Sequence, residues 1–173
     1  YLKTLLGEVK DYSYTPVEIP SVEGNRKLSF RGYERKNGEA GIRNEIWIVP
    51  TVGCVNGVAN ELVKLFNEKV AMAEPGTEGF EGIHAFTHTW GCSQLSDDHE
   101  NTRKILRDMI LHPNAGGVLV LGLGCENNQV AALKTLLGDY DANRIKFIEC
   151  QKVDDEIATG LQLLSELYDK VKL

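Results

Sequence analysis

The chain has 173 residues, 42% hydrophobic and 25% charged, which is long enough for one globular domain with a core but short for two. Its net charge of −6 argues against nucleic acid as a main partner, because no basic face offsets the acidic total. No apolar stretch approaches the ~20 residues of a membrane-spanning helix, so we expect no membrane partner either.

Residues 1–25 have the character of a linker. Pro16, Pro20 and Gly24 interrupt any hydrophobic periodicity. The N-terminus lacks the basic start, long apolar middle and cleavage site of a signal peptide, and it does not begin with Met. We therefore expect residues 1–25 to be a linker from a missing N-terminal domain and residues 26–173 to be a single α/β domain, in a fragment of a longer cytoplasmic enzyme.

The next segment predicts a β-hairpin. Residues 27–44, KLSFRGYERKNGEAGIRN, have Asn37-Gly38 near their middle. This dipeptide suits the positive φ values of a tight turn.

From residue 45 onward, strand patterns alternate with helical ones. The strands are expected at 45–52, 82–88, 116–124 and 145–149, and the helices at about 55–66, 96–110, 127–137 and 153–171. The run GGVLVLGLG at 116–124 is typical of a central parallel strand that is buried on both faces. These four βα units predict an α/β fold with a Rossmann-like parallel sheet flanked by helices.

All four cysteines follow predicted strands. Cys54, Cys92 and Cys125 each come directly after a glycine, whereas Cys150 does not. Because carboxyl ends of parallel strands meet at the edge where such sheets bind ligands, we expect the thiols to gather there. Glycine lets the backbone turn sharply and approach a ligand, and a following helix N-terminus favours a thiolate.

Three thiolates that leave one coordination position open predict a catalytic metal site. Such ligands suit iron or zinc, and the paired C-x₂-C motifs of a structural zinc site do not occur in the sequence. We predict that Cys54, Cys92 and Cys125 hold a single metal ion or an iron–sulfur cluster. The alternative is that cysteine is simply a small residue suited to a crowded turn. We expect Cys150 to be structural or a peripheral member of the site.

Other polar residues are expected at the same edge. His88 is the candidate general base, because histidine exchanges protons near neutral pH; the alternative is a histidine that only caps a strand. Glu126 is a second catalytic candidate, or a ligand, or an acidic residue that complements a helix dipole. Thr89 and Asn127 are candidate substrate-binding residues. The turn GLGCEN at 122–127 also resembles a dinucleotide motif, but Asn127 replaces its third glycine, which disfavours NAD.

Several motifs together resemble the altronate dehydratase/galactarate dehydratase family. They are RGYERKNGEAGIRNEIWIVPTV, GCVNGVA, THTWGCSQLSDD and HPNAGGVLVLGLGCENN, in the order that the family shows. The match runs from about Phe30 to the end of the chain and is similar above all to the central domain of the altronate dehydratases. Complete family members carry a small domain before this segment and a large domain after it.

The resemblance implies an iron-dependent dehydration of a sugar acid. Family members convert D-altronate to 2-dehydro-3-deoxy-D-gluconate in galacturonate breakdown, dehydrate galactarate, or act as a sulfolactate sulfo-lyase. The shared chemistry is a β-elimination from a 2-hydroxy acid, with Fe²⁺ or an iron–sulfur cluster as cofactor. Arg43 and Asn44 are candidates for binding the substrate carboxylate, although Arg43 is equally suited to a salt bridge in the hairpin.

The expected partners are the sugar-acid substrate and the other domains of the same chain, with a homodimer as a further assembly. Two other hypotheses are a non-catalytic module that scaffolds or dimerises and a nucleotide-binding domain. We expect the isolated segment to be inactive, because the missing domains would supply the base, some metal ligands, or both.

Overall fold

The structure is a computed structural model, and it describes residues 13–19, 29–73 and 78–172. Residues 13–19 form neither helix nor strand and are exposed, while the rest of the predicted linker, 1–12 and 20–25, lies outside the described residues. The chain divides into two units, Tyr1–Phe30 and Arg31–Leu173. The fold and the site described below belong to the second unit.

The predicted hairpin is confirmed. Strands β1 (Tyr33–Glu34) and β2 (Ala40–Gly41) pair antiparallel. Gly38, in the turn between them, has a φ of 83° and donates its N–H to the carbonyl of Arg35 over 2.8 Å. The Asn37-Gly38 turn chemistry therefore does what the sequence indicates.

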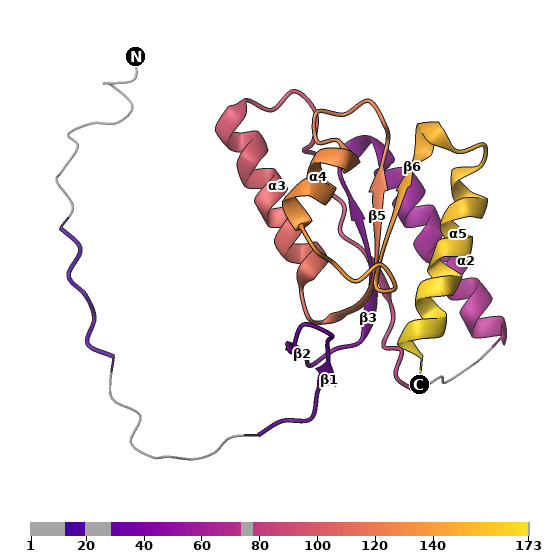
Figure 1. The fold of residues 1–173 in the computed structure, drawn as a ribbon, viewed down its shortest axis with the longest axis horizontal. Coiled ribbons are helices and arrows are strands. Elements are labelled where there is room, and N and C mark those ends of the chain that lie inside the picture. The colour runs from indigo at the N-terminus through magenta and orange to yellow at the C-terminus, as the bar shows by residue number, and fades with distance from the viewer. Residues whose placement is uncertain (1–12, 20–28, 74–77, 173) are drawn as a thin grey trace. The chain divides into compact units, whose positions relative to one another are not determined.

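Four parallel strands form the main sheet in the order β4-β3-β5-β6, which confirms the predicted Rossmann-like α/β fold (Figure 1). They are β3 (Glu45–Pro50), β4 (Ile83–Ala85), β5 (Ala115–Gly122) and β6 (Ile145–Glu149). Strand β5 is central, as predicted, and all its residues except Gly116 are buried. Strand β4 lies at the edge and is shorter than predicted, because the chain beyond Ala85 leaves the sheet to form a turn.

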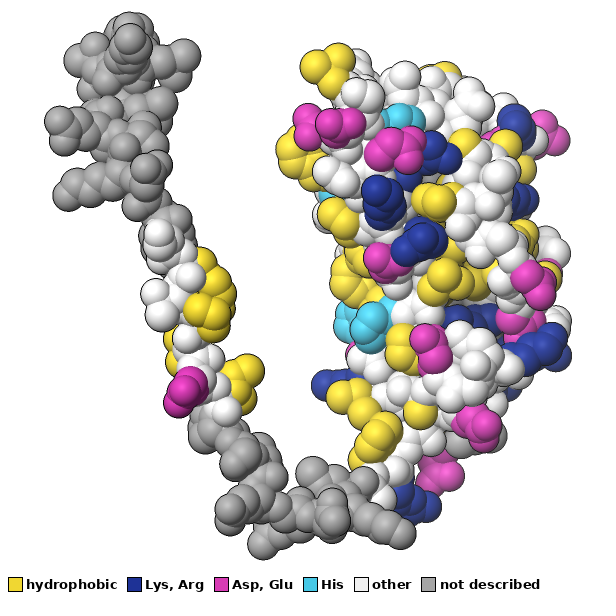
Figure 2. All heavy atoms as spheres, turned by 60° about the vertical axis from the view of Figure 1, so that its left-hand side comes forward, with side chains coloured by type: hydrophobic (Ala, Val, Ile, Leu, Met, Phe, Trp, Pro, Cys, Tyr) yellow, Lys and Arg dark blue, Asp and Glu magenta, His cyan; other side chains and the backbone are white. Residues whose placement is uncertain are grey.

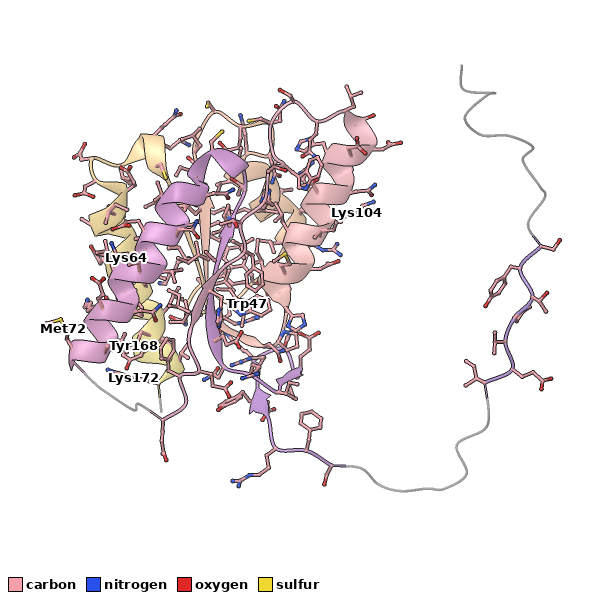
Figure 3. All side chains as sticks on the ribbon, turned by 180° about the vertical axis from the view of Figure 1, so that it is seen from behind. Trp47, Lys64, Met72, Lys104, Tyr168 and Lys172 are labelled. Carbon is pink, nitrogen blue, oxygen red and sulfur yellow. The ribbon has the colours of Figure 1, made fainter. Side chains whose placement is uncertain are left out.

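Helices cover both faces of the sheet (Figure 1). They are α2 (Asn56–Ala73) and α5 (Glu156–Val171) on one face, and α3 (Ser96–Leu111) and α4 (Val130–Leu137) on the other. Alternate strand residues supply the two cores. Ile46 and Ile48 pack toward α2 and α5, whereas Trp47 and Val49 pack with α3 and α4. Trp47 and Tyr168 mark these two cores in Figure 3.

The sheet has two distinct edges. The carboxyl ends of the strands point to the upper side in Figure 1, and the β1–β2 hairpin lies at the lower, amino-terminal side. Arg35 fixes the hairpin there, because its guanidinium donates to the carbonyls of Pro113 and Arg43 and to Oδ1 of Asn44. None of the helices in the described residues is long and apolar enough to cross a membrane.

Candidate functional site

The carboxyl edge of the sheet carries all four cysteines, as predicted. We call it the thiol edge; it consists of the turns at 51–56, 88–94 and 122–128 and the short helix η2 (Cys150–Lys152). Cys54, Cys92 and Cys125 are exposed, Cys150 is half-buried, and all four thiols are free. The chain runs from β3 outward to β4 and then back across to β5, so the carboxyl ends of β3 and β5 form the topological switch point where α/β sheets bind ligands.

Two of the glycines beside the cysteines have the positive φ of a sharp turn, as expected, and two of them also let neighbouring turns pack closely. The N–H of Gly53 donates to the carbonyl of Trp90 over 2.9 Å. A Cβ on Gly53 would lie 2.7 Å from the carbonyl oxygen of His88, and a Cβ on Gly91 would overlap the carbonyl oxygen of Thr51. Gly91 also has a φ of 108°, which favours glycine. Gly53 and Gly91 therefore let one turn pack against the next.

Side-chain amides tie the three turns together. Each amide group comes from one turn and bonds the backbone of another. The bonds join Asn56 Nδ2 to His88 O (2.7 Å), Asn128 Nδ2 to Thr51 O (3.0 Å) and Ser93 N to Asn127 Oδ1 (3.1 Å). The backbone of the thiol edge is thus cross-linked by its own hydrogen bonds, while three of its thiols remain on the surface.

Glu126 is a buried carboxylate whose hydrogen bonds lie within the thiol edge. It is 1% exposed and accepts hydrogen bonds from the Thr51 hydroxyl (2.6 Å) and from the N–H groups of Leu123 (3.2 Å) and Gly124 (2.6 Å). Burial acts to raise the pKa of Glu126, but these hydrogen bonds outweigh it and hold the pKa below its ordinary value. The carboxylate is charged, enclosed and fully occupied, so it cannot take a proton from a substrate at the surface.

His88 is held in place by both of its ring nitrogens. Nδ1 accepts a hydrogen bond from the N–H of Trp90 (3.1 Å), so Nε2 carries the proton that bonds the carbonyl of Pro50 (2.8 Å). In this arrangement the ring has no free nitrogen to act as the predicted base. The observed geometry corresponds to the alternative interpretation, a histidine that fixes the end of a strand.

Helix N-termini do not explain the thiols as the sequence suggested. Of the three cysteines that follow a glycine, only Cys54 adjoins a helix, in the short helix η1 (Gly53–Val55) before α2. Cys92 and Cys125 lie well before Ser96 and Val130, where α3 and α4 begin, and the helix dipole acts only within the first turn.

Cys150 has the structural role that we expected for it. It packs against the core beneath α2 and α5. Burial, followed by the nearby Glu156, raises the pKa of the Cys150 thiol to about 11. This thiol is therefore protonated at neutral pH, unlike a metal-bound cysteine.

Arg43 and Asn44 lie at the wrong edge of the sheet to bind a substrate at the thiols. They precede β3 and so stand at its amino end, whereas Cys54 follows its carboxyl end. Asn44 is buried, and its side-chain NH₂ donates to the carbonyls of Gly79 and Val171. Arg43 forms a salt bridge, with Nε 4.0 Å from Oε1 of Glu45, but this partner is the first residue of β3 and not a hairpin residue. Residues that directly precede a parallel strand lie at the opposite edge of the sheet from residues that directly follow one. The prediction for Arg43 and Asn44 did not take this into account.

Thr89 and Asn127 do reach the thiol edge, and both are exposed. Thr89 lines a shallow pocket of about 320 Å³ together with Cys54, Cys92 and His88. The side-chain carbonyl oxygen of Asn127 accepts a hydrogen bond from Ser93 N, as described above. Its side-chain NH₂ group is therefore the part that remains to bind a ligand. Of the four predicted substrate-binding residues, these two keep a suitable position.

The described residues do not form a complete metal site. No three His, Cys, Asp or Glu side chains among them come together in a group that could hold an ion. Cys54 and Cys92 share one pocket, while Cys125 lies on the adjoining turn, where its sulfur accepts a long hydrogen bond (3.8 Å) from Gln151. The thiols are of the right chemical kind for iron, but the described residues do not by themselves arrange three ligands around an ion.

Sequence reasoning missed the residues that build this edge. Thr51 and Asn128 are fully buried, yet Thr51 was not considered and Asn128 was noted only as a polar residue after Cys125, with no role. Their signal was present: each is a polar residue directly after an apolar run or a Gly-Cys turn, at a place where a buried polar group must find a partner.

Comparison with known proteins gives one matching family and several similar proteins. Residues 32–172 match the family described as "D-galactarate dehydratase/Altronate hydrolase, second domain". The chain is 49% identical over 170 residues to altronate dehydratase of Bacillus subtilis (strain 168), a match that covers 98% of this chain and 33% of the relative. It is 48% identical over 172 residues to altronate dehydratase of Escherichia coli (strain K12), with 98% and 34% covered.

A more distant relative is galactarate dehydratase (L-threo-forming) of Escherichia coli (strain K12), 30% identical over 152 residues, with 87% of this chain and 28% of the relative covered. The chain therefore spans about a third of the length of these relatives. No solved structure gives a significant match.

Proposed function

Because the chain belongs to the D-galactarate dehydratase/altronate hydrolase family as its second domain, we propose that it is part of an enzyme that removes water from a sugar acid. D-Altronate is the proposed substrate, since both altronate dehydratases are much more similar to the chain than the galactarate dehydratase is. The proposed product is 2-dehydro-3-deoxy-D-gluconate.

The reaction requires one base and one acid. The base removes the proton on C2 of the 2-hydroxy acid, the C3–O bond breaks, and the departing hydroxyl takes a proton and leaves as water. The resulting enol gains a proton at C3 and becomes the 2-keto acid. Charge builds on the carboxylate side during the first step and must be stabilised by the site.

The thiol edge is where this chain would contribute. The observation that carries the proposal is the exposure of three free thiols at the switch point of the sheet, on turns fixed by internal hydrogen bonds. Thr89 and Asn127 would bind substrate hydroxyls there. Since both nitrogens of His88 are engaged and Glu126 is enclosed, the base would come from residues outside this chain, and His88 would act as a positioning residue.

Iron is part of the proposal, with an incomplete ligand set in this chain. Cys54 and Cys92 face one pocket and are the ligands that this chain would give first, with Cys125 on the next turn as a third. Further ligands would come from outside the described residues, among which no complete group exists. Thiolate ligands suit iron in either form, the single ion or the cluster.

A chimera tests the proposal. This chain would replace the corresponding third of the Bacillus subtilis relative, and the anaerobic, iron-supplied protein would be assayed with D-altronate, galactarate and sulfolactate. We expect turnover of D-altronate. Turnover of galactarate or sulfolactate alone would overturn the proposed substrate.

Cysteine variants of the same chimera test the site. The double variant Cys54→Ser/Cys92→Ser should lose bound iron and at least about 100-fold in turnover. Cys150→Ser, which alters a buried thiol beside the core, is the matched control and should keep both. Full iron content and full turnover in the double variant would show that the thiols are packing residues of a non-catalytic scaffold.

A further inference from the structure

An apolar groove lies beside α3, next to the thiol edge. Its volume is about 550 Å³, and it runs between the segment after β4 and the helix. Its apolar walls are Phe86, Trp90, Ile105, Leu106 and Met109. Trp90 and His88 line both this groove and the smaller thiol pocket, so the two are neighbours.

The groove is bordered by large hydrophobic side chains that face solvent. Trp90 is 58% exposed, Ile105 is 61% exposed and Leu95, just before α3, is 81% exposed. Figure 2 shows hydrophobic side chains running down one side of the face that α3 presents. Large exposed apolar patches on a soluble domain mark contact surfaces, and exposed tryptophan is enriched among residues that dominate binding energy.

The chemistry of the groove does not suit a sugar acid. Among the described residues that line it there is no Lys or Arg, and Asp98 would repel a carboxylate. Three of its polar side chains, those of His88, Gln94 and Thr102, already form hydrogen bonds within the domain. Gln94 accepts from the N–H of Gly91 and donates to the hydroxyl of Thr102, and His88 bonds Pro50 and Trp90 as described above. A ligand of this groove must therefore be mainly apolar, as the buried centre of a protein interface is.

We propose that the groove seats another domain of an altronate dehydratase-type chain, and that this domain places its polar residues over the thiol edge. Two observations select this occupant. The relatives are about three times longer than the matched part, so most of each lies outside it. Among the described residues, the thiol edge lacks both a free base and a complete metal-binding group. A domain bound beside Trp90 would lie close enough to the thiol pocket to supply them. The proposal that a domain occupies the groove is independent of the proposed function. Only the proposal that this domain extends over the thiols rests on it.

Oxidative footprinting with hydroxyl radicals tests directly whether another domain covers the groove. The oxidation rate of Trp90 would be compared between the 173-residue chain alone and the chimera with the Bacillus subtilis relative, by mass spectrometry of peptides. Trp90 should be oxidised at least about fivefold more slowly in the chimera. Met72, which is 87% exposed at the far end of α2 (Figure 3), should be oxidised equally in both. Equal oxidation of Trp90 in both proteins would overturn the proposal.

The isolated chain distinguishes a second copy from a second domain. Protection of Trp90 that rises with the concentration of the isolated chain would identify a homodimer as the occupant and would overturn the proposal. A constant rate over that concentration range supports the domain.

A charge placed in the groove provides an independent check. Ile105→Asp in the chimera should restore Trp90 oxidation toward the rate of the isolated chain, because an aspartate is costly to bury unpaired. Met72→Asp is the matched control, a charge on another exposed hydrophobic residue, and should leave Trp90 protected. Unchanged protection in Ile105→Asp would count against the seat. A chimera that protects Trp90 but turns over no substrate would refute the proposed function and leave the seat standing.

Discussion

The two edges of the parallel sheet use the same kinds of residue for different ends. At the amino edge, buried or half-buried polar groups are paired with neighbours. Arg35 donates to three oxygen atoms, and Arg144 donates to the carbonyls of Ala115, Leu111 and His112. These bonds lock the hairpin and the end of α3 onto the sheet, and they leave these guanidiniums little capacity to bind a ligand.

At the thiol edge, internal hydrogen bonds hold the turns and engage the side chains of Glu126 and His88, but they leave other side chains at the surface. The turns are joined by amides and by closely packed glycines, but the thiols of Cys54 and Cys92 and the ring of Trp90 remain exposed. The comparison teaches that polar residues close together in the sequence are a weaker sign of function than exposed side chains that the fold does not need for its own hydrogen bonds. Arg43 and Asn44 seemed chemically suitable, yet they belong to the edge whose groups serve structure.

Glycine substitutions should give the largest difference in the free energy of unfolding between the two edges of the sheet. Gly91→Ala should lower the free energy of unfolding by about 3 kcal/mol, because the new Cβ overlaps the Thr51 carbonyl and the φ of 108° disfavours alanine. Gly38→Ala in the hairpin, with a φ of 83° and no atom within 4 Å of the new Cβ, should cost only about 1 kcal/mol. Urea unfolding of the 173-residue chain measures both. Equal costs would mean that the turns of the thiol edge can move apart.

The sequence was sufficient for the fold because the signals were local. The continuous apolar run before Gly124 and the helical spacing along 153–171 each report how a short segment is buried. Placing all four cysteines at one edge also followed, since parallel strands must end on the same side. What remained beyond prediction was strand order, because it depends on contacts between distant segments.

Side-chain partners were the other unpredictable part. The bond between Thr51 and Glu126 joins residues separated by 75 positions, and it converts a candidate base into a buried anchor. His88 presents the same problem, since only the folded chain shows that Pro50 and Trp90 occupy both of its nitrogens. A residue type at the right edge predicts a location, but the role depends on which donors and acceptors remain unused.

A substitution of Glu126 tests the same comparison of the two edges through the pH dependence of the free energy of unfolding. Glu126→Gln should lower the free energy of unfolding by about 2 kcal/mol at pH 7, since the amide presents an N–H toward the N–H of Gly124. The folded-state pKa is lowered, so the stabilisation is present above the ordinary glutamate pKa and is lost as the pH falls through the folded pKa. The difference between wild type and variant should therefore shrink from pH 7 to pH 3.

A carboxylate at the amino edge is the control for this experiment. Glu81 accepts one hydrogen bond, from the N–H of Asn44, and its residue is exposed. Glu81→Gln keeps an oxygen that can accept this bond, so it should change the free energy of unfolding by less than about 0.5 kcal/mol at pH 7. A cost in Glu81→Gln as large as that in Glu126→Gln would contradict the assignment of Glu126 as the enclosed anchor.

The thiols should give the smallest effects on stability. Cys92→Ser or Cys54→Ser should change the free energy of unfolding by less than about 0.5 kcal/mol, because both side chains are exposed. Cys150→Ser should cost about 1 kcal/mol, because it places a hydroxyl against the core beneath α5. Urea unfolding at one pH compares the three variants. A large loss in Cys92→Ser would make that thiol a packing residue after all. A small one means that any loss of iron or turnover in the same variant reports on chemistry rather than on folding.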